Sequence, residues 1–123
     1  MSTGKIMMLQ DQHGTTLFLQ DMLIAQGLAG HVDLAGRFDQ AVDLIDRAGT
    51  YDLVVINLPG AWEDGLRLAG WLNQQVEACP ILLIVPPEFD SDSIHNNFVA
   101  LPTPLSLCDF TESTRFMLQQ SKN

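Results

Sequence analysis

Two short, continuous apolar runs constrain the fold of this chain more than any other feature. Residues 53–56 (LVVI) and 81–85 (ILLIV) are apolar at every position, and both runs end at turn-forming residues. A strand that is covered on one face alternates apolar and polar residues, so an unbroken run indicates a strand covered on both faces. Such strands occur in parallel sheets that carry helices on both sides. The two runs therefore predict an α/β fold.

Segments with helical periodicity separate these runs from other short apolar stretches. We predict helices at 15–27, 37–49, 62–78 and 106–120, the last one capped by Ser106, and further strands at 5–9, 31–35 and 98–102. The alternation of strands and helices predicts a doubly wound, parallel, five-stranded sheet. Residues 86–97 lie where a fourth helix would fall but have the composition of a loop, so we expect that helix to be short or missing.

Length and charge limit the classes of function. The chain has 123 residues and a net charge of -9, which predicts one acidic domain spanning 1–123. Binding to nucleic acid or to an anionic membrane needs clustered Lys and Arg, so we expect neither partner. No apolar run approaches the roughly 20 residues of a membrane-spanning helix. We expect a cytoplasmic protein in which Cys79 and Cys108 are free thiols.

The candidate site follows from the sheet. Ligands of parallel α/β folds bind beyond the carboxyl ends of the strands, which directs attention to residues 10–13, 57–60, 85–88 and 101–104. Asn57 stands out there because it places a polar side chain directly after a buried strand.

Four segments, taken in order, resemble those of response-regulator receiver domains. They are 5–12 (KIMMLQDQ), 51–68 (YDLVVINLPGAWEDGLRL), 79–85 (CPILLIV) and 100–105 (ALPTPL). The spacing between Asn57 and the Asp64-Gly65-Leu66 triplet also agrees with that family. The resemblance covers essentially the full chain. It implies a CheY-like, flavodoxin-like fold with strand order 2-1-3-4-5 and a role in bacterial two-component signal transduction.

Receiver domains of the usual kind transfer a phosphoryl group to an aspartate, with a Mg²⁺ ion held by that aspartate and an acidic pair. The resemblance places Asn57 at the phosphoacceptor position and Gln10 and Asp11 at the acidic pair. An amide cannot form an acyl phosphate, and Mg²⁺ prefers anionic oxygen ligands. Asp11 is thus a weak candidate metal ligand, and we expect no bound metal or other cofactor.

The remaining family positions have changed as well. Val85 occupies the position of a Thr or Ser that bonds the phosphoryl group, Thr103 that of a Lys, and Leu101 that of an aromatic switch residue. These changes agree with one another, because a buried Lys without a phosphoaspartate would be an unpaired charge. We interpret the chain as a pseudo-receiver that is not an enzyme.

A pseudo-receiver would act by binding a protein: a sensor kinase, an output domain or a second copy of itself. The usual dimer face of the family includes the fourth helix, so pairing here could shift to the last helix or to the helix that carries Trp71. Trp71 itself is either exposed at an interface or partly buried at a helix edge. Asn57 is either a structural hydrogen-bonding group or a functional one that mimics one fixed signalling state or binds an unidentified ligand. The chain could also be the N-terminal domain of a longer regulator.

A flavodoxin-like module that binds flavin or cobalamin is the alternative function. Asp11 and His13 begin a cobalamin-type Asp-x-His-x-x-Gly signature, but Thr16 stands where the glycine is required. Gly14 followed by two threonines is a faint match to a flavin phosphate loop. The three histidines share no spacing typical of a metal site.

Overall fold

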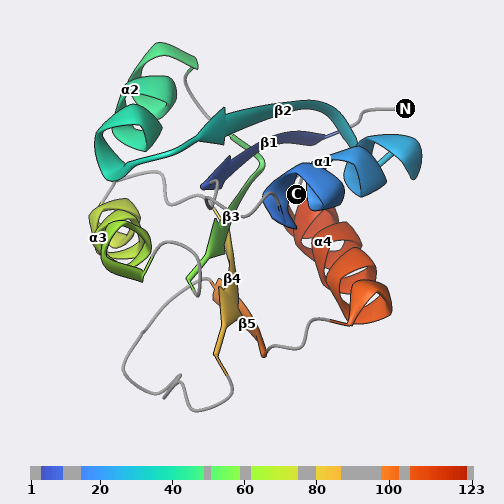
Figure 1. The fold of residues 1–123 in the computed structure, drawn as a ribbon. Coiled ribbons are helices and arrows are strands. Elements are labelled where there is room, and N and C mark those ends of the chain that lie inside the picture. The colour runs from blue at the N-terminus through green and yellow to red at the C-terminus, as the bar shows by residue number, and fades with distance from the viewer. Residues whose placement is uncertain are drawn as a thin grey trace.

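The computed structural model describes residues 4–9, 15–48, 51–58, 62–74, 80–86, 98–102 and 106–121. These residues form nine elements in the order β1 (Gly4–Leu9), α1 (Thr15–Ala25), β2 (Ala29–Ala35), α2 (Phe38–Ala48), β3 (Leu53–Asn57), α3 (Trp62–Asn73), β4 (Ile81–Val85), β5 (Phe98–Pro102) and α4 (Leu107–Ser121) (Figure 1). The predicted alternation of strands and helices is confirmed. The prediction of a short or missing helix at 86–97 falls almost entirely outside the described residues.

All five strands are parallel and lie in one sheet. Their order is β2-β1-β3-β4-β5, which confirms the predicted order 2-1-3-4-5. The strand order reverses next to β1, because the chain runs outward from β1 to β2 and then returns to β3 on the other side. The carboxyl ends of β1 and β3 lie beside this reversal, where ligands of such folds bind.

Helices cover both faces of the sheet (Figure 1). On one face, α2 and α3 pack against a group of buried side chains that includes Val54 and Ile56 of β3; we call this cluster 1. On the other face, α1 and α4 pack against cluster 2, which includes Leu53 and Val55. Successive residues of β3 therefore point into different apolar layers, which explains why this strand has no polar residue before Asn57.

The helix ends follow from local chemistry. Gly27 lies just beyond α1 with φ 72°, a left-handed conformation that glycine adopts without steric cost. The backbone N–H of Leu28 reaches back to the carbonyl of Leu23 at 3.0 Å, as in a Schellman-type helix end. At the start of α4, the Ser106 hydroxyl accepts a hydrogen bond from the N–H of Asp109 at 3.3 Å. Ser106 is thus confirmed as a helix cap.

Trp71 of α3 is half-buried and packs against cluster 1. This confirms the expectation that Trp71 is partly buried at a helix edge. Among the described residues, no helix combines the length and the apolarity that crossing a membrane requires.

Candidate functional site

The carboxyl edge of the sheet brings predicted site residues into one row. Asn57 is the last residue of β3 and only 4% of its surface is exposed. It pairs with Ile84 of β4, which in turn pairs with Leu101 of β5. Asn57 and Leu101 therefore flank Ile84 at the same level of the sheet.

Strand alternation decides which face these side chains occupy. Leu53 and Val55 belong to cluster 2, so Asn57, two residues further along β3, is directed to the same face. Leu101 also packs against cluster 2. Val85, one residue beyond the row, is buried in cluster 1 on the opposite face. The structure thus groups Asn57 with Leu101 and separates Val85 from both.

Leu58, the residue after Asn57, packs between the carboxyl edge of the sheet and α3. Leu58 is fully buried, and its N–H donates to the carbonyl of Ile84 at 2.9 Å. Its side chain fills the space that a side chain at Gly65 would need. A Cβ atom at Gly65 would lie 2.6 Å from Cδ2 of Leu58 and 2.8 Å from Cγ2 of Ile56. The glycine lets α3 approach the end of β3 closely, which explains its place at a fixed spacing after Asn57.

The described strand ends at this edge carry no ionisable side chain. Strands β1, β3, β4 and β5 end at Leu9, Asn57, Val85 and Pro102, respectively. None of them offers a carboxylate nucleophile, an anionic oxygen for Mg²⁺ or a cation for a phosphoryl group. A buried amide can donate and accept hydrogen bonds there, but it cannot form an acyl phosphate.

The assignments of Gln10, Asp11 and Thr103 concern residues outside the described ranges and stay predictions. Within those ranges, no group of three or more His, Cys, Asp or Glu side chains is arranged to hold a metal ion.

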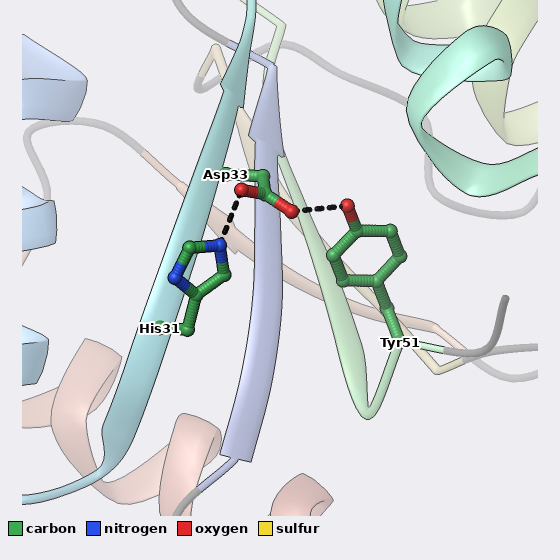
Figure 2. A network of polar contacts seen from close by, with 3 residues as sticks. All are labelled: His31, Asp33 and Tyr51. Atoms are coloured by element: carbon green, nitrogen blue, oxygen red, sulfur yellow. Dashed lines mark hydrogen bonds and ion pairs between the residues drawn. The ribbon is translucent and has the colours of Figure 1, made fainter. Parts of the chain in front are cut away.

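A second polar group of side chains lies near the amino-terminal end of the sheet (Figure 2). Asp33 of β2 contacts two residues through its two carboxylate oxygens. The Tyr51 hydroxyl lies 2.5 Å from Oδ2, and the His31 Nε2 lies 2.5 Å from Oδ1. The His31 side chain is 64% exposed and that of Asp33 is 22% exposed, whereas Tyr51 is buried in cluster 1. We call these three residues the Asp33 cluster.

Electrostatics fixes the direction of the hydrogen bonds in the Asp33 cluster. Partial burial raises the pKa of Asp33, but the hydrogen bonds from Tyr51 and His31 and the electrostatic interactions with His31 and Lys5 outweigh it, so that pKa is lowered overall. Burial and the neighbouring carboxylate raise the pKa of Tyr51. Asp33 is thus an acceptor only, Tyr51 keeps its proton, and His31 presents an N–H to the carboxylate.

Sequence reasoning missed the Asp33 cluster. The alternation of His31, Val32 and Asp33 in a predicted strand was visible as a sign that the two polar residues share a face. The partner, Tyr51, is 18 residues away from Asp33 and could be recognised only once β2 and β3 were placed in the sheet.

Comparisons with known proteins agree with the topology. No protein-family model matches the sequence, and no curated protein matches it significantly. Several solved structures are similar in fold. The receiver domain of a Francisella response regulator has a TM-score of 0.79 and 18% identity, with 97% of this chain and 99% of that chain covered.

Two further solved structures extend the comparison. A CheY-like receiver domain protein from Methanospirillum hungatei has a TM-score of 0.79 and 18% identity, with 98% of each chain covered. The signal receiver domain of an HD domain-containing protein from Pseudomonas fluorescens has a TM-score of 0.78 and 19% identity, with 99% of this chain and 91% of that chain covered. Together with strand order 2-1-3-4-5 and helices on both faces, these similarities show that the chain has the fold of response-regulator receiver domains.

Proposed function

We propose that this chain is an atypical receiver domain, a pseudo-receiver, that works in bacterial two-component-type signal transduction by binding another protein. On this proposal it acts in the cytoplasm without aspartyl phosphorylation, without a cofactor and without enzymatic activity. The partner is a sensor kinase, an output domain or a second copy of the chain. The receiver-domain fold supports the signalling part of the proposal.

The observation that carries the proposal is the environment of Asn57. The resemblance places the phosphoacceptor at this position, and the side chain there is an amide at the end of β3 that is only 4% exposed. Phosphoryl transfer to a carboxylate depends on anionic ligands for Mg²⁺ and on positive charge around the transferred group. The row formed by Asn57, Ile84 and Leu101 provides neither.

The phosphorylation part is tested by intact-mass spectrometry after incubation with acetyl phosphate and Mg²⁺. We expect the mass of the wild-type chain to stay unchanged. We expect the Asn57→Asp variant to label poorly, because it restores a nucleophile without the surrounding charges. A matched variant that adds Gln10→Asp, Val85→Thr and Thr103→Lys to Asn57→Asp should label more strongly, since it restores the acid, hydroxyl and ammonium groups that the resemblance assigns to phosphoryl transfer.

Stoichiometric labelling of the wild-type chain would overturn the pseudo-receiver. The interaction part needs a separate measurement, which is the affinity of the chain for a sensor kinase or an output domain. We expect that affinity to be the same with and without acetyl phosphate. An affinity that rises or falls with the phosphodonor would contradict the proposal.

A further inference from the structure

The β1–β2 ladder contains an irregularity near the amino-terminal end of both strands. Gly4 pairs with Ala29, but the next residue, Lys5, pairs with His31, so Gly30 is an extra residue in β2. An extra residue of this kind is a β-bulge. Removing the bulge would shift the rest of β2 by one residue, and a one-residue shift moves every side chain of a strand to the other face.

The observed register places the polar residues of β2 on the face of cluster 1. His31 lies beside Lys5, and Asp33 lies beside Met7, which belongs to cluster 1. In the shifted register His31 would lie beside Ile6 and Asp33 beside Met8. Both of these β1 residues are fully buried in cluster 2, which consists of apolar side chains under α1 and α4. The Asp33 carboxylate would then lose the hydrogen bond that it accepts from the Tyr51 hydroxyl.

Only one member of the Asp33 cluster can distinguish the two registers. His31 and Asp33 both belong to β2, two residues apart, so their contact would survive a shift of the strand. Tyr51 precedes β3 and reaches Asp33 across β1 (Figure 2). The contact between Tyr51 and Asp33 therefore exists only in the observed register.

Tyr51 is held in place independently of β2. Its neighbour Asp52 donates its N–H to the carbonyl of Lys5 at 2.8 Å, and the Asp52 carboxylate accepts the Lys5 N–H at 2.8 Å. The Lys5 ammonium lies 5.1 Å from the centre of the Tyr51 ring, and that ring is packed in cluster 1. These contacts attach Tyr51 to β1, so its hydroxyl is a fixed reference point for the position of β2.

We propose that the Tyr51–Asp33 hydrogen bond is a register lock, which selects the bulged register of the edge strand β2 over the register shifted by one residue. A partly buried polar pair is a weak source of stability compared with apolar packing, and its best-attested role is to specify one register among several. An edge strand has a ladder partner on one side only, so the register of β2 is fixed by β1 alone and depends on such specification.

The decisive test is the double variant Asp33→Leu/Tyr51→Phe, studied by NMR. It removes both polar partners, so no buried group is left without a hydrogen bond, and it leaves the exposed His31 as the only polar side chain of β2. We expect a second set of backbone resonances for residues 31–35, with cross-strand contacts from Met7 to Val32 in place of those to residue 33. Asp43→Ala is the matched control, because it removes a carboxylate that pairs with Arg47 of the same helix at 3.0 Å, and it should keep one set.

A second measurement uses Tyr51→Phe alone. We expect amide exchange in β2 to become about 10- to 100-fold faster, as for the loss of a hydrogen bond to a charged group, while β3 and β4 keep their protection. A single native register in the double variant would overturn the lock. So would equal acceleration in all strands, or loss of the fold in both variants, because either result would make the contact a source of overall stability only.

Discussion

At the scale of single residues, the closest packing near the candidate site is between Gly65 and the end of β3. A Cβ atom at Gly65 would meet Leu58 and Ile56, and both of these side chains are fully buried. Buried side chains in a close-packed interior have little room to move aside. Gly70 in the same helix is exposed, and a Cβ atom there would meet nothing within 4 Å. Helix α3 thus has no room for a side chain at Gly65 but has room for one at Gly70.

We expect Gly65→Ala to lower the free energy of unfolding by about 1–3 kcal/mol, because overpacking outweighs the gain in helix propensity. Gly70→Ala is the matched control and should raise it by up to about 1 kcal/mol. Denaturant unfolding of both variants measures the difference. Equal stabilisation by the two substitutions would show that α3 does not need its close approach to β3.

At the scale of elements, the Asp33 cluster makes the attachment of β2 sensitive to acid. The pKa of Asp33 is lowered in the folded chain relative to the value of about 3.9 in an unfolded chain. A carboxyl group of this kind stabilises the fold above the unfolded value, and its contribution is lost as the pH falls toward the folded value.

We therefore expect the free energy of unfolding to fall as the pH drops below about 5, and Asp33→Asn to make that decline shallower. Urea unfolding between pH 7 and pH 3 measures both slopes. Tyr51→Phe removes one of the two hydrogen bonds that lower the pKa, so its slope should be intermediate. An Asp33→Asn slope as steep as that of the wild type would contradict this role of Asp33.

The elements differ in how far their sequence predicts them. Ile81–Val85 was predicted without error because a strand covered on both faces has a continuous apolar run that ends at prolines. In α1 the residues facing the sheet were harder to identify, since the helix carries apolar residues on several sides. Leu19 is buried there, whereas Ile24 and Ala25 are exposed.

Asn57 and the Asp33 cluster also differ in how far the sequence predicts them. Asn57 was identified from the order and spacing of segments along the chain, which are local properties. The Asp33 cluster depends on the extra residue Gly30 in β2 and on Tyr51 reaching across β1. Neither the bulge nor the crossing can be inferred from local periodicity.

At the scale of the whole molecule, charge governs self-association. Two copies with a net charge of -9 each repel one another at low ionic strength, and salt screens this repulsion over about 10 Å at 0.1 M. We expect a homodimer, the self-binding form of the proposed function, to be favoured as salt increases from about 20 mM to 500 mM. Sedimentation velocity at both concentrations measures it. Monomers throughout would exclude this partner, and a dimer that salt dissociates would contradict the charge argument.

The uncharged row at the carboxyl edge also restricts how this domain can change by successive single substitutions. Replacing Asn57 by an aspartate would put a carboxylate where only 4% of the residue is exposed, beside Ile84 and Leu101. A buried carboxylate costs several kcal/mol unless an opposite charge compensates it, a large part of the stability of a small domain. A substitution that adds the carboxylate alone would therefore lower the stability without adding the positive charge that phosphoryl transfer requires. Paired substitutions avoid this barrier, so an experiment that seeks to restore phosphorylation should introduce opposite charges together.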